Sequence, residues 1–308
     1  MKKVIIVLGP TAVGKTKIGI ELAKRLNTEV ISGDSVQVYK GLDIGSAKVT
    51  KKEMDGVVHH LIDVLEPTET YSVCEFQKAS RVLMDKLDIP LIVGGTGLYI
   101  NAAISNYEFD APKRDFSFEE EYNDLSNEEL YRMLEECDPI AATNIHHNNR
   151  KRVLRALYAA KADAPLGERN KKNELLYDAY IIYLNVEREL LYERINMRVL
   201  QMIEEGLEDE VRNLYEKGIT PHAIGYQEWL PYFEGKISKD EVISEIQKNS
   251  RHLAKRQMTW FRNQMNTNFY EVNLSNIKET IDIIYQDVLS FLGGEWFGYL
   301  FNRNAWLW

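Results

Sequence analysis

The chain has 308 residues, of which 38 are Lys or Arg and 47 are Asp or Glu, giving a formal net charge of −9. This length allows one large domain or two smaller ones, and no apolar run is long enough to cross a membrane. The acidic balance by itself argues against a nucleic-acid partner. Cys74, Cys137 and the adjacent His59 and His60 lack partners at metal-ligand spacing. We therefore expect free thiols in a reducing cytoplasm and packing or orienting histidines instead of a zinc site.

The first predicted element is a buried strand over 4–8, which leads directly into Gly-Pro-Thr-Ala-Val-Gly-Lys-Thr. Apolar residues at helical spacing (Ile18, Leu22 and Leu26) follow it. Gly-x-x-x-x-Gly-Lys-Thr between a strand and a helix is the P-loop pattern, in which backbone N–H groups and the helix N-terminus surround a phosphate. The lysine adds a positive charge and the threonine hydroxyl binds Mg²⁺. The pattern predicts a site for a di- or triphosphate, formed by Gly9, Pro10, Thr11, Ala12, Val13, Gly14, Lys15 and Thr16.

Two further predicted strands, over 30–32 and 89–93, end close to polar residues. Ligands of open α/β sheets bind beyond the carboxyl ends of the strands, so Asp34 is expected at the same edge as the P-loop. A P-loop ATPase would usually carry an Asp after the second of these strands to hold Mg²⁺. This chain has Gly94, Gly95 and Thr96 there, which disfavours an ATPase.

The pattern changes after the third strand. Helices without an intervening strand are predicted over 118–124, 127–137 and 149–161, and a strand returns only at 179–184. The sequence therefore predicts an α/β core with a parallel sheet flanked by helices, interrupted by an all-helical insertion. We assign the core to 1–111 and 176–295, the insertion to 112–175, and no role to the aromatic tail at 296–308.

Later segments predict helices over 188–204, 207–217, 240–262 and 277–292, with a short strand over 269–272. Arg194 and Arg198 share a face of the first of these helices, where spacing alone equally allows solvated surface arginines. Basic and aromatic residues interleave near the end of the 240–262 helix, as they often do on RNA-contacting surfaces. Together with the basic cluster at 150–155, this local charge allows an RNA partner despite the acidic average.

These motifs, in this order, resemble the tRNA dimethylallyltransferases, also called tRNA isopentenyltransferases. The resemblance spans about 4–272 and departs from the family at His147 and Asn149, where Pro and Asp are usual. Besides the P-loop, it rests on 34–39, 45–48, 59–63, 94–99, 152–157, 225–226 and 254–262.

The resemblance implies transfer of a dimethylallyl group from dimethylallyl diphosphate to N6 of the adenosine 3′ of the anticodon, with release of pyrophosphate. The P-loop would then hold a leaving group, which accounts for the missing ATPase acid. The implied catalytic residues are Asp34 as general base, Thr96 as a positioning group and Arg198 as a diphosphate contact, with Mg²⁺ on Thr16. The adenosine has to be flipped out of the anticodon loop to react.

The expected partners are tRNA and dimethylallyl diphosphate, with no membrane, for a monomer in the cytoplasm. The resemblance implies tRNA contacts by Asp34, Ser35, Val36, Gln37, Gly97, Lys151, Arg152, Val153, Leu154, Arg155, Gly225, Tyr226, Lys255 and Arg256.

Three alternatives remain beside this interpretation. An adenylate isopentenyltransferase would share the core but have no use for an RNA-gripping insertion. A small-molecule P-loop kinase receives no support from the segment 94–99 or from the late basic run. A non-catalytic RNA-binding module would leave Asp34 and the P-loop unexplained.

Overall fold

The computed structural model describes residues 1–107, 116–166 and 174–293, and the chain divides into two compact units. One unit consists of Met1–Ser105 and the chain from Leu175 onwards, and the other is Asn106–Glu174. The boundary expected at 112 and the tail at 296–308 lie outside the described residues.

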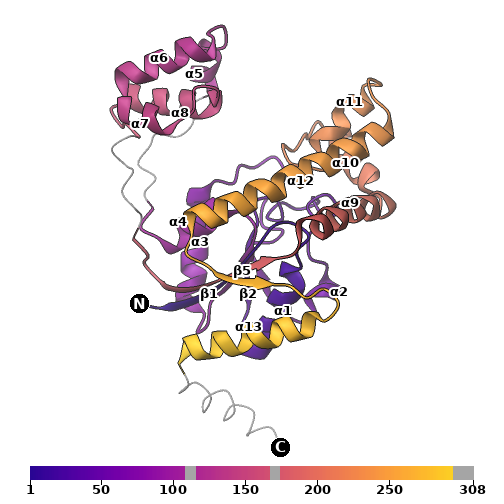
Figure 1. Cartoon of the computed structure of the whole chain (residues 1–308). Coiled ribbons are helices and arrows are strands. Elements are labelled where there is room, and N and C mark those ends of the chain that lie inside the picture. The colour runs from indigo at the N-terminus through magenta and orange to yellow at the C-terminus, as the bar shows by residue number, and fades with distance from the viewer. Residues whose placement is uncertain (108–115, 167–173, 294–308) are drawn as a thin grey trace, which may run out of the picture. The chain divides into compact units, whose positions relative to one another are not determined.

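The larger unit is built on a six-stranded, fully parallel sheet, as predicted (Figure 1). The strand order is β3-β2-β4-β1-β5-β6. Successive side chains of the central strand point to opposite faces: Ile5 and Val7 enter one core, whereas Val4 and Ile6 enter the other. Burial on both faces is typical of a parallel sheet covered by helices on each side. The strands are β1 (Lys3–Leu8), β2 (Val30–Gly33), β3 (His59–His60), β4 (Leu91–Gly94), β5 (Asp178–Asn185) and β6 (Asn268–Glu271).

Helices cover both faces of this sheet. α1 (Lys15–Leu26) and α13 (Ile277–Leu292) contribute to one core, and α3 (Val73–Lys86) and α4 (Gly97–Ile104) to the other. Ser72 and Glu75 form a capping box that fixes the start of α3.

A third hydrophobic core lies within the same unit, around Tyr226, Trp229 and Val242. The longest helix, α12, contributes to this core near its start and to the sheet cores near its end, through Met258 and Phe261. α12 therefore connects the third core to the sheet. The elements concerned are α9 (Arg188–Glu204), α10 (Leu207–Glu216), η2 (Gln227–Trp229), α11 (Leu230–Phe233) and α12 (Lys239–Gln264); the short α2 (Lys51–Met54) lies elsewhere in the unit.

The smaller unit is all-helical in its described part. α6 and α8 were predicted, and Asn149 caps α8 by accepting a hydrogen bond from the N–H of Arg152, a role that Asp fills equally well. The sequence prediction missed α7, although Asp138 at its N-cap and Pro139 at its first position are start signals. The helices are α5 (Phe116–Glu121), α6 (Asn127–Cys137), α7 (Pro139–Asn144) and α8 (Arg150–Lys161). Among the described residues no helix has the length and apolarity needed to span a bilayer.

Candidate active site

The sheet brings three predicted site segments to one edge. The register pairs Leu8 with Gly94 and Gly33 with Gly94, so β1, β4 and β2 end side by side. The P-loop follows the first of these strands, Thr96 the second and Asp34 the third. The prediction that Asp34 lies at the same edge as the P-loop is confirmed. Lys15, Thr16, Asp34 and Gln37 line one cavity there.

The P-loop has a conformation that only small residues allow. Ala12 and Gly14 have φ angles of 65° and 107°, left-handed values of the kind that occur in the backbone turns of anion-binding loops. A Cβ on Gly9 would lie 2.8 Å from the carbonyl oxygen of Leu184, so this position has no room for a side chain. Val13 is fully buried and anchors the loop to the core.

Not every N–H of the P-loop is free for a phosphate. The N–H of Thr11 donates to Oε1 of Gln257 at 3.0 Å, and that of Val13 donates to the carbonyl of Pro10 at 3.4 Å. In this conformation the N–H groups of Thr11 and Val13 are therefore already bonded within the protein, and a diphosphate contact by either of them stays a prediction. No acceptor among the described residues takes the N–H groups of Lys15 and Thr16, at the start of α1.

Lys15 is held over the P-loop in a strongly positive environment. Its Nζ donates to the carbonyl oxygens of Gly9 at 3.0 Å and Pro10 at 2.8 Å. Burial, and after it the charge of Arg198, lowers the pKa of Lys15 to about 8, while Asp34 opposes the shift. An anion bound here would compensate both effects.

Two arginines reach the P-loop from α9. Arg194 Nε donates to the carbonyl of Ala12 at 2.9 Å, and Nη1 of the half-buried Arg198 lies 3.5 Å from Oγ1 of Thr11. Burial lowers the pKa of Arg198, an effect that the charge of Asp34 opposes. Arg198 is half-buried beside the P-loop, so the alternative of a solvated surface arginine does not hold for it, whereas Arg194 is exposed and contacts the loop through one hydrogen bond.

Asp34 uses one carboxylate oxygen to shape its own loop. Oδ1 accepts from the N–H of Val36 at 2.8 Å and from that of Gln37 at 3.3 Å, the geometry of an Asx turn. Oδ2 accepts no hydrogen bond from the described part of the chain. One oxygen thus fixes the carboxylate, and the other is left to accept a proton.

Thr96 and Gly97 follow β4, at the start of α4. The N–H of Thr96 donates to the carbonyl of Gly33 at 3.3 Å, and its side chain makes no capping bond. A Cβ on Gly97 would lie 2.2 Å from the ring of Trp260 on α12. Gly97 therefore allows the close packing of α12 against α4, which its predicted role as a tRNA contact did not anticipate.

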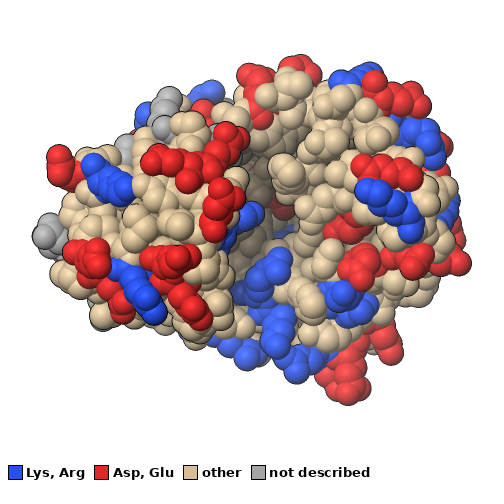
Figure 2. Space-filling model, turned by 90° about the horizontal axis from the view of Figure 1, so that it is seen from above, with Lys and Arg blue, Asp and Glu red and all other residues tan. Residues whose placement is uncertain are grey.

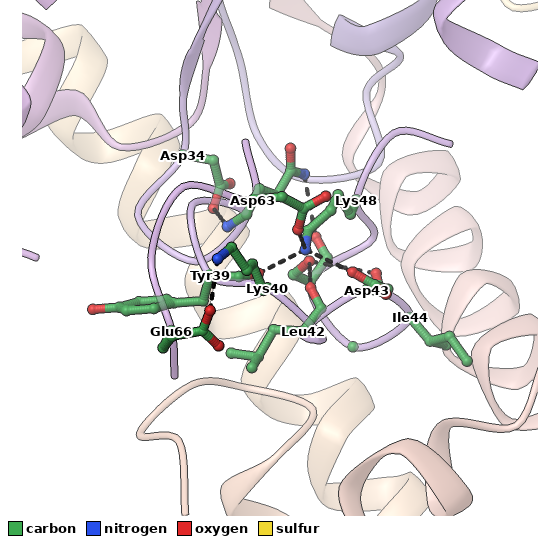
Figure 3. A network of polar contacts seen from close by, with 12 residues as sticks. Asp34, Tyr39, Lys40, Leu42, Asp43, Ile44, Lys48, Asp63 and Glu66 are labelled. Carbon is green, nitrogen blue, oxygen red and sulfur yellow. Dashed lines mark hydrogen bonds and ion pairs between the residues drawn. The ribbon is translucent and has the colours of Figure 1, made fainter. Parts of the chain in front are cut away.

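The loop that carries Asp34 and Gln37 is fixed by a polar network around the buried Lys48 (Figure 3). Lys48 Nζ donates to the carbonyl of Tyr39 at 2.7 Å and forms ion pairs with Asp43 at 2.6 Å and with Asp63. The sequence resemblance included Lys48, Tyr39 and Asp63, but not Asp43, and did not indicate this scaffolding role.

A second clamp holds the same loop to α10. The carboxylate of Glu210 accepts hydrogen bonds from the N–H groups of Asp43, Ile44 and Gly45 at 2.8–3.1 Å and from the hydroxyl of Tyr226 at 2.8 Å. Nothing in the sequence singled out Glu210, because the backbone N–H groups that it accepts lie more than 160 residues earlier in the chain.

Three predicted tRNA contacts are core residues. Tyr226 is 1% exposed and its ring packs where a Cβ on Gly45 would lie; Gly225 packs against the backbone of the same residue. Val153 and Leu154 are buried between the helices of the smaller unit. The buried side chains of Tyr226, Val153 and Leu154 therefore support surfaces in this conformation, and direct tRNA contacts at these positions stay a prediction.

The remaining predicted tRNA contacts divide between the two units. Lys151 and Arg152 are exposed on α8, and Arg155 is half-buried with its Nη1 lacking a hydrogen-bond partner. Lys255 and Arg256 are exposed on α12. An open hollow on that helix is lined by His252, Lys255, Arg256, Thr259, Trp260, Asn263 and Gln264. Figure 2 shows acidic side chains over much of one face and basic ones gathered near its lower edge.

The basic cluster of α8 also contains a structural arginine. Arg150 donates to the carbonyls of Leu125 at 2.6 Å and Tyr122 at 2.5 Å, and so ties α8 to the end of α5 and the start of α6. The sequence analysis grouped Arg150 with the basic cluster at 150–155, because a sequence does not distinguish an arginine that points inward from one that points to solvent.

His59 is a cavity residue that the sequence did not assign. It lines the cavity with Asp34, and burial lowers the pKa of His59, so its ring is neutral near pH 7. His60 instead bonds Glu29. In the described part of the chain no three His, Cys, Asp or Glu side chains form a group that could hold a metal ion.

The sheet and the cradle define an α/β protein of the P-loop NTPase-like class. A family model described as IPP transferase matches residues 37–264. The tRNA dimethylallyltransferase of Geobacillus kaustophilus is 48% identical over 286 residues, covering 88% of this chain and 91% of that one. That of Anoxybacillus flavithermus is 47% identical over 290 residues, covering 90% and 93%. The chain belongs to the IPP transferase family.

Solved structures agree with this assignment. A tRNA isopentenylpyrophosphate transferase from Bacillus halodurans superposes with a TM-score of 0.73 at 41% identity, covering 95% of this chain and 97% of that one. A eukaryotic dimethylallyltransferase described as acting on tRNA gives 0.78 at 27% identity, covering 94% and 78%. These relatives give no support to an adenylate isopentenyltransferase or a kinase.

Proposed function

We propose that this protein transfers the dimethylallyl group of dimethylallyl diphosphate to N6 of the adenosine 3′ of the anticodon in tRNA, releasing pyrophosphate. The observation that carries the proposal is the cavity shared by the P-loop and Asp34, with glycines where an ATPase would carry an acid after β4. The relatives named tRNA dimethylallyltransferase supply the substrate class.

The cradle would bind the diphosphate and stabilise it as it leaves. The P-loop offers the N–H groups of Lys15 and Thr16, and the ammonium group of Lys15 lies over the loop. Arg198 approaches from α9. Negative charge grows on the pyrophosphate as the carbon–oxygen bond breaks, and charges already fixed in place stabilise it without reorganising.

The same cavity suits Mg²⁺. Thr16 offers a hydroxyl oxygen ligand there, and Mg²⁺ typically takes one or two protein ligands together with phosphate oxygens and water. Bound Mg²⁺ would neutralise charge on the diphosphate.

Asp34 would take the proton of the adenosine amine through Oδ2, while its Oδ1 stays bonded to the loop. The amine is a weak nucleophile, so holding it in line with the reacting carbon contributes much of the rate. Thr96 would help to position the leaving group or the base. Lys151, Arg152, Arg155, Lys255 and Arg256 would bind RNA phosphates, with Gln37 near the flipped base.

The test is a product assay. The protein is incubated with dimethylallyl diphosphate, Mg²⁺ and either an anticodon stem-loop or AMP, and the products are weighed by mass spectrometry. The expected result is a gain of one dimethylallyl group on the RNA alone. A gain on AMP without one on RNA would overturn the tRNA assignment, and phosphate transfer from ATP would indicate a kinase.

A further inference from the structure

Gln257 on α12 joins two parts of the active site that are far apart in the sequence. Its Oε1 accepts the N–H of Thr11 in the P-loop at 3.0 Å, and its Nε2 donates to the carbonyl of Gly95 at 3.0 Å. Gly95 directly precedes Thr96. One side-chain amide therefore sets the spacing between the diphosphate cradle and the turn after β4.

The helix that carries Gln257 is held rigidly. The neighbouring Met258 packs in one sheet core and Phe261 in the other, while Trp260 lies against Gly97. Since α12 cannot shift without disturbing both cores, it gives Gln257 a fixed position from which to hold the two loops.

The space around the amide is tightly defined. A Cβ on Gly95 would lie 2.6 Å from Nε2 of Gln257 and 3.7 Å from Nζ of Lys15. The Gln257 amide thus lies close to the charge that would face the diphosphate. Only an amide supplies an acceptor and a donor at this length without adding charge beside Lys15 and Arg198.

We propose that Gln257 is a positioning residue of the transfer reaction, which fixes the P-loop relative to the Gly95–Thr96 turn. This inference rests on the proposed function. Gln257 leaves the N–H groups of Lys15 and Thr16 to the phosphates and satisfies that of Thr11 itself. Loss of the bridge lets the cradle and the turn move independently, and a displacement of about 1 Å between reacting groups costs on the order of 100-fold in rate.

The experiment replaces Gln257 with Met, which has nearly the same length and helix propensity but neither hydrogen bond. The expected result is a fall in kcat of roughly 10- to 100-fold at saturating dimethylallyl diphosphate and stem-loop. The Kd for the stem-loop and the thermal unfolding midpoint should stay close to those of the wild type. Binding of inorganic pyrophosphate with Mg²⁺, followed by calorimetry, should weaken several-fold.

Two further variants sharpen the test. Gln257→Glu keeps an acceptor for Thr11 but turns a carboxylate oxygen toward the carbonyl of Gly95, so it should lose at least as much kcat as Gln257→Met. Gln247→Met is the matched control, because Gln247 also lies on α12 and donates to a backbone carbonyl, that of Asn196 at 3.2 Å, but bonds neither the P-loop nor the Gly95–Thr96 turn. Its kcat should remain near that of the wild type.

The inference is overturned if Gln257→Met or Gln257→Glu keeps the wild-type kcat, or if Gln247→Met loses as much. If Gln257→Met does not fold, Gln257→Glu and the pyrophosphate titration decide the question. Product formation by the wild type tests the proposed function separately. If the unaltered protein forms no product, the proposed function is contradicted, and the bridge made by Gln257 is then tested by pyrophosphate binding alone.

Discussion

The P-loop cradle and the basic face of α8 both carry positive charge, but the protein holds those charges differently. Each cation of the cradle is bound to the loop itself: Lys15 and Arg194 donate to its carbonyls and Arg198 approaches Thr11. On α8, Lys151 and Arg152 point to solvent. A reaction that must stabilise a leaving group needs charges fixed in advance, whereas binding of an RNA backbone tolerates mobile ones.

This comparison predicts its largest effect at Asp34. Asp34→Ala should lower kcat by roughly 100- to 10,000-fold, because it removes the proposed general base, while the Kd for the stem-loop changes little. Single-turnover assays at saturating RNA measure the first quantity and filter binding the second. Asp34→Asn is the control, since its Oδ1 can still accept the N–H groups of Val36 and Gln37. An Asn variant with wild-type turnover would exclude proton abstraction by this residue.

The second prediction concerns pH and Lys15. Its pKa is lowered to about 8 in the free protein, against about 10.5 when unfolded, so the folded protein binds fewer protons between these values and Lys15 favours folding as pH rises through this window. Pyrophosphate needs the charged form. Its affinity should therefore fall above pH 8, by up to about 10-fold per pH unit.

Calorimetry in buffers of different ionisation enthalpy should show proton uptake on pyrophosphate binding near pH 8. Lys15→Arg keeps the charge at all these pH values and should remove the dependence. A wild-type affinity that stays constant between pH 7 and pH 9.5 would contradict the assigned environment of Lys15.

The third prediction tests how rigidly the cradle is supported. Gly97→Ala places a methyl group 2.2 Å from the Trp260 ring, which packing cannot absorb, and should lower the free energy of unfolding by about 1–3 kcal/mol. Gly95→Ala places a methyl group 2.6 Å from Nε2 of Gln257 and should displace that side-chain end from its bridge, so it should destabilise less while lowering kcat. Denaturant unfolding and steady-state kinetics separate the two effects. Equal destabilisation by both substitutions would show that steric crowding by the added methyl group, and not loss of the Gln257 hydrogen bonds, determines the effect at this turn.

The smallest effects are expected on α8, where two neighbouring arginines should differ. Arg152→Ala removes one exposed charge, so stem-loop binding should weaken modestly and the slope of log K against log salt should decrease by about one. Arg150→Ala leaves the carbonyls of Leu125 and Tyr122 without their donor and should destabilise the smaller unit by about 1–3 kcal/mol. Titrations at several salt concentrations and thermal unfolding distinguish these outcomes. If Arg150→Ala weakened stem-loop binding and Arg152→Ala lowered stability instead, the roles assigned to the two arginines would be wrong.

Much of the cradle was predictable from sequence because its rules are local. The P-loop follows directly from the first strand, and the carboxyl-end rule for parallel strands placed Asp34 correctly. The helices Asn127–Cys137, Arg188–Glu204 and Ile277–Leu292 were predicted with their bounds. Their apolar spacing and end signals lie within a few residues of each element.

The missed features depend on contacts between distant segments. Gln257 and Glu210 are ordinary polar residues on helices, and only the fold brings them to Thr11 and Gly45. Tyr226 shared a motif with the site but turned out to be buried. Whether an arginine of α8 points inward or outward depends on a rotation of one residue, which composition does not specify.

The order in which the chain is synthesised gives the clamp at Glu210 a further consequence. The loop over 43–45 leaves the ribosome early, but the carboxylate that receives its N–H groups follows only after more than 160 further residues. The N–H of Thr11 in the P-loop likewise lacks this acceptor until Gln257 has been synthesised. A nascent chain that ends before α12 therefore contains the whole phosphate-binding motif without a finished catalytic centre, so premature termination should leave fragments unable to react.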